Sequence, residues 1–418
     1  MYAFKINGGK KLSGTVRVKG AKNAILPLMA AALLTDEPVT LHNISYLSDV
    51  VTLSELLKSM GAQIQCDSDS MTIQCNQITS TTASYEYVSK MRATFWVLGP
   101  LLGRFHEAKV SLPGGCAIGA RPVDLYIKAL ETMKADVCVE NGYVVAKGHL
   151  KAAEISFPKI SVGATHNTVM AAVLTPGVTI IHNPALEPEA IDLIRLLQQM
   201  GANIEGVGTR TLTIKGVKKL HGATHTVVSD RIETATFATA AGLTKGRIFV
   251  EGGRLDLMQA VADTLTPSGI LLEQTPKGLQ VDATGAHLTA VPVTTLEYPG
   301  FPTDSQPLLT TLLSLAKGDS LVTERIYENR FMHVPELKRM GANIDILDNK
   351  TVLIHGVPKL SGAIVTSSDL RGGVGLVLAG LAAEGETIVQ RVYHVDRGYD
   401  HIENKLNAIG ADVVRFKQ

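Results

Sequence analysis

The sequence predicts an α/β protein of two lobes, each built from three copies of one repeated unit. A helix-like stretch that ends in a small-residue turn and leads into a strand occurs six times along the 418 residues. Successive copies lie roughly 70 residues apart, and together they account for the whole chain. Apolar residues make up 45% of the sequence, enough for more than one hydrophobic core. The turns are centred on Gly61, Lys134, Gly201, Gly269, Gly341 and Gly410.

Glycine in five of these six turns explains how a helix can end and a strand can begin. Glycine enters the left-handed region of backbone space without a Cβ clash, so it is favoured directly after a helix. Lys134 is the exception. Alternating apolar residues follow several turns, and this period of two predicts strands at 143–146, 211–214 and 351–354.

A second repeated element, Lys-Leu-x-Gly, indicates how the lobes divide. It occurs at 11–14, 219–222 and 359–362. The first copy follows an alternating stretch, 2–6, that has no unit of its own, whereas the sixth unit ends at 413–416 without a following strand. We therefore predict that the N-terminal strand completes the sixth unit. The expected lobes are residues 22–229, which carry the loop around Cys116, and residues 1–21 together with 230–418.

The repeat by itself also permits an open solenoid built only for binding. Typical solenoid repeats are shorter than these units. In addition, the ends of an open array are capped, whereas here the N-terminal strand is predicted to close the last unit. Two closed lobes are therefore the favoured arrangement.

Charge and composition exclude several classes of protein. Lys plus Arg (40) and Asp plus Glu (39) nearly balance, which argues against a nucleic-acid partner or a polybasic membrane surface. The first ten residues do not resemble a signal peptide, and the longest apolar run, 24–34, is too short to span a bilayer. The sequence contains no ATP-binding or dinucleotide-binding glycine motif and no HExxH zinc motif. We expect a cytosolic protein without a metal or cofactor.

One of the four cysteines differs from the others in its surroundings. Cys116 lies in a glycine-rich loop, 112–122, close to Arg121. An exposed cysteine beside a cation can have a lowered pKa and act as an acid, a base or a nucleophile. No CxxC pair is present, and the remaining cysteines are expected to be small buried hydrophobic residues, namely Cys66, Cys75 and Cys138.

Charged residues recur at one type of turn. Equal intervals separate the three Lys-Leu-x-Gly elements from the turns that hold Lys22–Asn23, Asp230–Arg231 and Asp369–Arg371. Because related turns of a repeat lie at the same end of a lobe, these charges should line one rim. Any single arginine could be a solvated surface charge, but a recurrent set of cations suits a small polyanionic substrate. The further loop arginines are Arg92, Arg121, Arg330 and Arg397.

Asp304 has two interpretations. It follows a proline turn at 301–303, where a carboxylate could serve as a general base. The apolar run 307–315 begins soon after it, however, so the local sequence favours a helix N-cap.

Taken together, these residues resemble the enolpyruvyl transferase (EPSP synthase) family over essentially the whole chain. Within that family they are most similar to the enzymes that act on UDP-N-acetylglucosamine. The resemblance implies two inside-out α/β barrel lobes, each with three βαβαββ units, that close around the substrates. The matching segments are 20–24, 91–100, 113–124, 161–165, 230–234, 301–304, 328–336, 369–371 and 394–398.

The resemblance also implies the reaction. The enolpyruvyl group of phosphoenolpyruvate would pass to the 3′-hydroxyl of UDP-N-acetylglucosamine, with release of phosphate, by addition followed by elimination. This is the first committed step of peptidoglycan synthesis, on which cell-wall biogenesis, cell shape and cell division depend. The cysteine that matches Cys116 is the residue that fosfomycin alkylates in this family.

The family's site residues can be carried over position by position. Catalytic roles would fall to Cys116, which protonates phosphoenolpyruvate and can form a covalent adduct with it, and to Asp304, which takes the hydroxyl proton. Lys22 and Arg397 would stabilise the departing phosphate. Contacts to phosphoenolpyruvate would come from Lys22, Asn23, Cys116, Arg121, Arg330, Arg371 and Arg397. Contacts to the sugar nucleotide would come from Asn23, Arg92, Arg121, Pro122, Val123, Asp124, Leu125, Lys159, Ile160, Ser161, Val162, Asp304 and Ile326.

Two positions depart from the family pattern, because relatives often carry a lysine in place of Ser48 and an acid in place of Val51. The sister enzyme of the shikimate pathway shares the fold and the donor but lacks the cysteine loop, so Cys116 argues against it. A non-catalytic sensor of the sugar nucleotide is disfavoured because Cys116, Asp304 and the cations are all present.

Overall fold

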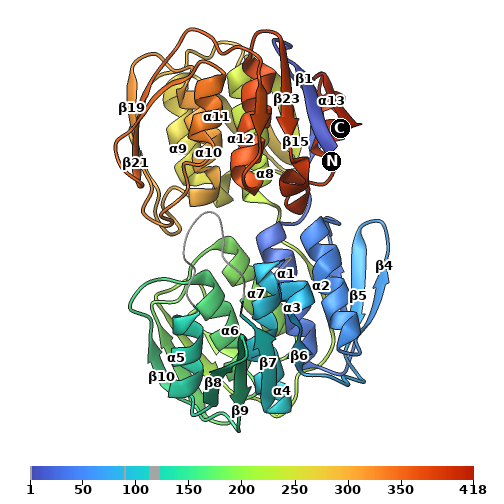
Figure 1. Cartoon of the computed structure of the whole chain (residues 1–418). Helices are drawn as coiled ribbons and strands as arrows, with labels where there is room; N and C mark the ends of the chain where they lie inside the picture. Colours follow the sequence, from blue (N-terminus) through green and yellow to red (C-terminus); the bar gives the residue numbers. More distant parts are fainter. Residues whose placement is uncertain (1, 89–90, 113–122) are drawn as a thin grey trace. The chain divides into compact units, whose positions relative to one another are not determined.

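A computed structural model describes residues 2–88, 91–112 and 123–418, without the side chains of residues 92–94. The described chain forms two compact units (Figure 1). The N-terminal lobe comprises residues 20–112 and 123–228, and the C-terminal lobe comprises residues 2–19 and 229–418.

Three four-stranded sheets of the described residues belong to the N-terminal lobe. In each sheet a parallel pair of strands is continued by two antiparallel neighbours. The strand orders are β14 (Ala223–Thr226), β3 (Val39–His42), β5 (Ser70–Gln74), β4 (Gln63–Cys66); β6 (Thr82–Ala83), β7 (Glu107–Ser111), β9 (Tyr143–Lys147), β8 (Asp136–Glu140); and β10 (Glu154–Ser156), β11 (Val178–His182), β13 (Thr211–Lys215), β12 (Asn203–Glu205).

In the C-terminal lobe, the described residues form three sheets of the same pattern. The recurrence confirms the predicted α/β fold of six repeated units, three to a lobe. The strand orders are β2 (Ser13–Arg17), β15 (Arg247–Glu251), β17 (Gly278–Asp282), β16 (Leu271–Thr275); β18 (Val293–Thr294), β19 (Asp319–Thr323), β21 (Thr351–His355), β20 (Asn343–Ile346); and β22 (Ile364–Thr366), β23 (Glu386–Gln390), β1 (Tyr2–Asn7), β24 (Val413–Lys417).

The N-terminal strand completes the sixth unit, as predicted. β1 lies between β23 and β24 and runs antiparallel to both, so that Phe4 is opposite Val389 on one side and Arg415 on the other. In the other lobe, β14 at the end of its chain segment pairs in parallel with β3 near its beginning. Each lobe is therefore closed by a strand that is distant in sequence.

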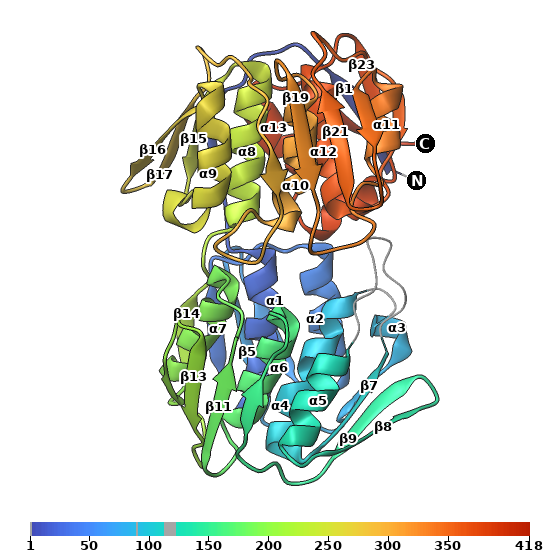
Figure 2. The same ribbon diagram turned by 90° about the vertical axis from the view of Figure 1, so that its left-hand side faces the viewer.

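Helices fill the interior of each lobe and the sheets lie outside them, which is the inside-out arrangement (Figures 1 and 2). The apolar side chains of these helices are buried because they are covered on all sides by the sheets and by one another. Six interior helices can be named in the described residues: α1 (Lys22–Ala31), α4 (Leu98–Phe105), α6 (Val162–Ala172), α8 (Arg231–Thr244), α10 (Gln306–Leu313) and α12 (Leu370–Ala382).

Shorter or amphipathic helices connect the strands. They are α2 (Ser48–Ser59), α3 (Tyr85–Val88), α5 (Asp124–Thr132), α7 (Pro188–Gln199), α9 (Gln259–Leu265), α11 (Val334–Arg339) and α13 (Ile402–Ala408). The described residues also form short 3₁₀ helices, namely η1 (Ala32–Leu34), η2 (Arg92–Val97), η3 (Leu255–Leu257), η4 (Thr266–Ser268), η5 (Thr303–Ser305) and η6 (Val392–Arg397).

The repeated turns have the predicted left-handed backbone. The five glycines all have positive φ, for example 108° at Gly61 and 97° at Gly201. Lys134, which replaces glycine in the second unit, also adopts a positive φ of 69°. The repeat therefore imposes this conformation even on a residue with a Cβ atom.

The expectation that three cysteines are buried is wrong for two of them. Cys75 is buried, and burial raises the pKa of its thiol to about 12. Cys66 and Cys138 are exposed because they lie on β4 and β8, each the outermost strand of its sheet.

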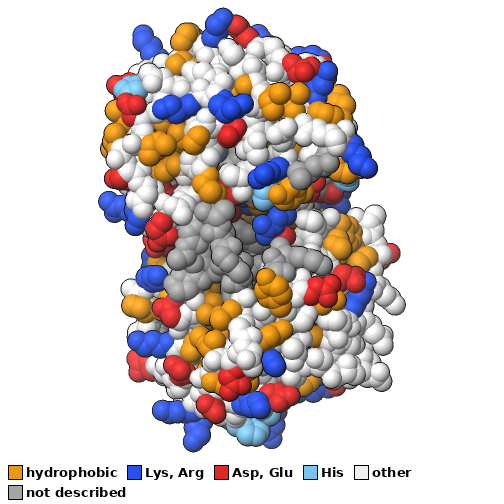
Figure 3. Space-filling model, in the orientation of Figure 1, with side chains coloured by type: hydrophobic (Ala, Val, Ile, Leu, Met, Phe, Trp, Pro, Cys, Tyr) orange, Lys and Arg blue, Asp and Glu red, His pale blue; other side chains and the backbone are white. Residues whose placement is uncertain are grey.

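Charged side chains of both signs are interspersed on the face shown in Figure 3, in keeping with the near balance of charges in the sequence. Within the described part of the chain, no helix is both long enough and apolar enough to cross a bilayer.

Candidate active site

The predicted phosphate ligand Lys22 begins α1 and is buried. Its Nζ lies 2.8 Å from Oδ2 of Asp49, in the first turn of α2. The side chains of Lys22 and Asp49 are only 10% and 5% exposed, so the ion pair is shielded from solvent. Asn23, the next residue of α1, is half-buried. A cation is thus fixed at the start of an interior helix, where the backbone N–H groups also favour an anion.

Several other predicted residues of the N-terminal lobe lie at helix starts. Val123 is the N-cap of α5, and Asp124 and Leu125 are its first residues. Ser161 is the N-cap of α6, where its hydroxyl accepts a hydrogen bond from the backbone N–H of Ala164 at 3.3 Å. The neighbours of Ser161 in the predicted set are the exposed Lys159 and the half-buried Ile160 and Val162.

Part of the predicted site falls outside the described residues. This applies to Cys116, Arg121 and Pro122, and to the side chain of Arg92, whose backbone begins η2. The roles expected for these four residues stay predictions.

In the C-terminal lobe, two predicted arginines contact the carboxylate of a third predicted residue, Asp304. Arg330 donates from Nη2 to Oδ1 of Asp304 at 2.8 Å, and Arg371 donates from Nε to Oδ2 at 3.3 Å. Nη2 of Arg371 also forms an ion pair with Oδ2 at 3.2 Å. Both arginine side chains are 3% exposed, whereas Asp304 is 25% exposed. The arginines are therefore not solvated surface charges. They hold a carboxylate that still reaches solvent.

The local sequence favoured Asp304 as a helix N-cap, and this interpretation is wrong. Asp304 lies within η5, and the N-cap of the following α10 is Ser305, without a side-chain capping bond. The carboxylate of Asp304 instead accepts hydrogen bonds from two arginines that are distant in sequence. The capping roles in this lobe belong to Asp230 on α8 and Asp369 on α12, whose carboxylates accept two backbone N–H groups each.

A buried glutamate that the sequence analysis missed holds the turns beside Asp304. Glu324 is fully buried, and its carboxylate accepts the hydroxyls of Thr295 at 2.8 Å and Thr303 at 2.9 Å. It also accepts the backbone N–H of Ile326 at 2.7 Å, which places this predicted sugar-nucleotide contact. The only signal in the sequence was an acidic residue directly after a strand.

Tyr399 was also missed. Its hydroxyl accepts a hydrogen bond from Nη1 of Arg371 at 3.0 Å and lies 2.7 Å from the hydroxyl of Thr236. Tyr399 and Thr236 are buried, and burial raises the pKa of Tyr399. A tyrosine 28 residues after Arg371 carries no local pattern that could reveal this contact.

The charge of Arg397, at the end of η6, acts on the same region. The pKa of His394 is lowered, first by burial and then by the charge of Arg397, while Asp369 opposes this shift. Asp369 and Arg330 likewise act on His333, whose pKa falls to about 4, mainly because it is buried. The charge of Asp369, the N-cap of α12, therefore acts on both histidines, together with Arg397 at His394 and with Arg330 at His333.

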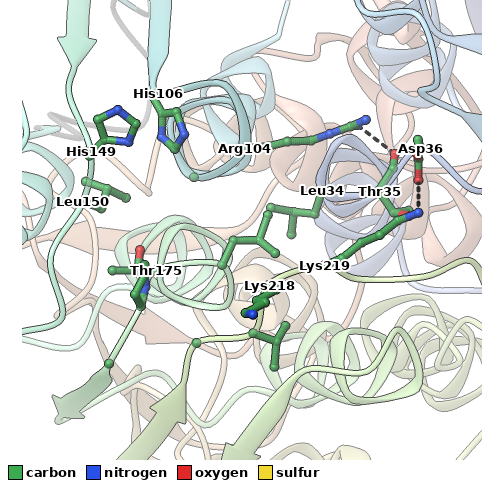
Figure 4. Close-up of a pocket in the computed structure, with 16 residues that line it drawn as sticks. Leu34, Thr35, Asp36, Arg104, His106, His149, Leu150, Thr175, Lys218 and Lys219 are labelled. Atoms are coloured by element: carbon green, nitrogen blue, oxygen red, sulfur yellow. Dashed lines mark hydrogen bonds and ion pairs between the residues drawn. The ribbon is translucent and has the colours of Figure 1, made fainter.

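A separate cavity of about 790 Å³ lies in the N-terminal lobe (Figure 4). Among the predicted site residues that the structure describes, none lines this cavity. Arg104 at its edge donates to the carbonyls of Leu33 and Thr35, and Lys219 pairs with Asp36. Arg104 and Lys219 thus bind the segment that follows α1, so we assign both side chains a structural role.

Known proteins are similar to this chain over nearly its whole length. Residues 6–406 match the family described as EPSP synthase (3-phosphoshikimate 1-carboxyvinyltransferase). A UDP-N-acetylglucosamine 1-carboxyvinyltransferase of Paramagnetospirillum magneticum is 51% identical over 428 positions, covering 100% of this chain and 99% of the relative. The enzyme of the same name from Dinoroseobacter shibae is 52% identical over 422 positions, covering 100% of both chains.

Solved structures share the fold. The enolpyruvyl transferase NikO from Streptomyces tendae has a TM-score of 0.89 at 24% identity and covers 99% of both chains. An EPSP synthase from Acinetobacter baumannii has a TM-score of 0.75 at 18% identity over 100% of both chains.

Proposed function

The chain belongs to the EPSP synthase family and, within it, to the UDP-N-acetylglucosamine 1-carboxyvinyltransferases, and on this premise we propose that it transfers the enolpyruvyl group of phosphoenolpyruvate to the 3′-hydroxyl of UDP-N-acetylglucosamine. The observation that carries the proposal is the identity of about half of all positions over the full length of both chains. Phosphate is the second product. The reaction begins peptidoglycan synthesis, and we place it in the cytoplasm.

The proposed chemistry assigns a task to each side chain. Cys116 protonates C3 of phosphoenolpyruvate, which builds positive charge at C2. The 3′-hydroxyl oxygen attacks C2 while Asp304 takes the hydroxyl proton. Loss of a proton from the new methyl group and departure of phosphate then complete the enolpyruvyl ether. Lys22 and Arg397, with Arg121, stabilise the leaving phosphate.

Binding is assigned to the remaining residues. Arg330 and Arg371 face the carboxylate of phosphoenolpyruvate, and their present pairing with the carboxylate of Asp304 supports this role, because the same groups suit either partner. Asn23 lies beside the phosphate. The sugar nucleotide is assigned to Arg92, to residues 121–125 and 159–162, and to Ile326.

Release of phosphate tests the proposal. Purified protein is incubated with phosphoenolpyruvate and either UDP-N-acetylglucosamine or shikimate 3-phosphate. We expect release only with the sugar nucleotide. Release only with shikimate 3-phosphate would assign the sister activity, and no release with either acceptor would leave a binding protein without this chemistry.

Two variants test the assigned acid and base. Cys116→Ser should lose most turnover, and Asp304→Asn should lose about 10²–10⁴-fold because a proton acceptor is removed. Mass spectrometry after exposure to fosfomycin should find one adduct, on Cys116, that is missing from Cys116→Ser. Full activity of Cys116→Ser would refute its role as the acid.

A further inference from the structure

One chain of hydrogen bonds links three of the repeated units of the C-terminal lobe. It begins at Asp304 in η5, passes through Arg371 on α12 and Tyr399 after η6, and ends at Thr236 on α8. Arg371, Tyr399 and Thr236 are buried, and only Asp304 reaches solvent. Tyr399 and Thr236, the last two members of this chain of hydrogen bonds, have no role in the chemistry proposed above.

One set of hydrogen-bond directions satisfies every group in this chain. Thr236 has one hydroxyl proton and donates it to the carbonyl of Ile232 at 2.8 Å within α8. With that proton engaged, its oxygen is the acceptor available to the Tyr399 hydroxyl, at 2.7 Å. The oxygen of Tyr399 in turn accepts from Nη1 of Arg371 at 3.0 Å. Tyr399 must stay a neutral phenol for this order, and its burial favours the neutral form.

The arrangement holds the guanidinium of Arg371 from two sides. Nε and Nη2 point to Asp304, while Nη1 points to Tyr399, whose ring centroid lies 5.4 Å from the guanidinium carbon. A planar group held along two of its edges cannot rotate freely. Without the phenol hydroxyl, Nη1 would be left buried and without this acceptor.

We infer that Tyr399, braced by Thr236, is a positioning residue that orients Arg371 for the carboxylate of phosphoenolpyruvate. The inference rests on the proposed function, because that function assigns the carboxylate to Arg371. Tyr399 contacts the arginine, and Thr236 contacts Tyr399. Neither is assigned a contact with the substrate, so they should govern affinity for phosphoenolpyruvate more than the rate of the chemical step.

Kinetics of two hydroxyl deletions test the inference. Tyr399→Phe keeps the ring, and Thr236→Val keeps the shape of the side chain. Each should raise KM for phosphoenolpyruvate about five- to thirtyfold, while kcat and KM for UDP-N-acetylglucosamine change less than about threefold. The double variant should have the same KM for phosphoenolpyruvate as Tyr399→Phe alone, because both changes interrupt the same series of hydrogen bonds.

Thr239→Val is the matched control. Thr239 is buried on the same helix, and its hydroxyl donates to the carbonyl of Ala235 at 2.8 Å, as that of Thr236 does to Ile232. It lacks the link to Tyr399, so KM for phosphoenolpyruvate should stay within about twofold of the wild-type value. Equal effects of Thr236→Val and Thr239→Val on this KM would overturn the inference. If Tyr399→Phe does not fold, Thr236→Val carries the test.

A second readout does not depend on turnover. The Nε–H signal of Arg371, assigned by its loss in Arg371→Lys, is followed by nitrogen-15 NMR of the free protein. It should shift or broaden in Tyr399→Phe and Thr236→Val and stay unchanged in Thr239→Val. An unchanged signal in both of the first two variants would refute the positioning role. If these two variants show the NMR changes but the wild-type protein releases no phosphate, the proposed function is refuted and the positioning of Arg371 stands.

Discussion

Lys22 and Asp49 form a buried ion pair, with 2.8 Å between Nζ and Oδ2. The lysine begins an interior helix and the aspartate lies in the first turn of α2, so two elements of the first repeat are tied together at the proposed phosphate site. Asp49 is the acid next to the two departures from the family pattern, Ser48 and Val51. The cation of this site therefore keeps a carboxylate partner although those two positions differ.

Asp49→Asn should weaken both stability and binding of phosphoenolpyruvate. The change removes the carboxylate partner of the buried Lys22 ammonium, which we expect to cost about 3–5 kcal/mol of unfolding free energy. KM for phosphoenolpyruvate should rise because Lys22 is no longer held in place. Urea unfolding and steady-state kinetics measure the two effects. Asp36→Asn is the control, because its pair with Lys219 is about half exposed; similar losses in both variants would contradict a special role for Asp49.

Glu324→Gln should destabilise the C-terminal lobe and lower turnover. One carboxylate oxygen becomes an amide nitrogen that faces donors, so at least one of the bonds to Thr295, Thr303 and Ile326 is lost. We expect a loss of about 2–4 kcal/mol in urea unfolding. Turnover should fall as well, since Thr303 precedes Asp304. The exposed Glu273→Gln on β16 should match the wild type, and a wild-type midpoint for Glu324→Gln would show that the buried network is dispensable.

Gly99→Ala should loosen the packing of α4 against α6. A Cβ atom at Gly99 would lie 2.3 Å from the carbonyl oxygen of Asn167, which belongs to the backbone of α6. Alanine normally favours a helix by about 1 kcal/mol over glycine, but we expect this clash to outweigh the gain and leave a net loss of about 1–3 kcal/mol. Thermal unfolding tests the sign. Gly285→Ala, where a Cβ atom meets no atom within 4 Å, should leave the midpoint unchanged.

Acid should destabilise the N-terminal lobe partly through His166. Burial lowers the pKa of this histidine to about 3, and its ring contacts Trp96 edge-on. From the ordinary value of 6.5 downwards, the unfolded chain binds a proton that the folded lobe does not. Stability should therefore fall as the pH drops from 6.5 towards 3, by up to about 1.4 kcal/mol per pH unit for this group.

His166→Leu tests this linkage. Urea unfolding at pH 7, 6 and 5 should show a shallower loss of stability on acidification than in the wild type. His287→Leu removes an exposed histidine and should leave the pH dependence as it is. An unchanged pH dependence in His166→Leu would mean that other groups account for the acid sensitivity.

The turns could be predicted because the repeat makes them local. Positive φ at Gly61 and Gly201 and the strands that contain 143–146 and 211–214 follow from patterns within one unit. The pairing of β1 with β24 could be predicted because the sixth unit lacks a strand and the N-terminal strand lacks a unit. The exposure of Cys66 and Cys138 could not be predicted in this way. Both lie on outermost strands, and which strand is outermost depends on the order of strands in the sheet.

The sequence by itself determined the six-unit fold, the family and the residue types available for an anionic substrate, because periodicity and motifs are properties of neighbouring residues. Only the tertiary structure decided that Asp304 is bound by Arg330 and Arg371 rather than capping a helix. It also decided that Arg371 donates to Tyr399, which in turn is hydrogen-bonded to Thr236. These partners come from different repeats, up to 163 residues apart. Hydrogen bonds over such distances form only when the closed lobe packs the starts of its interior helices together, and no local pattern records that packing.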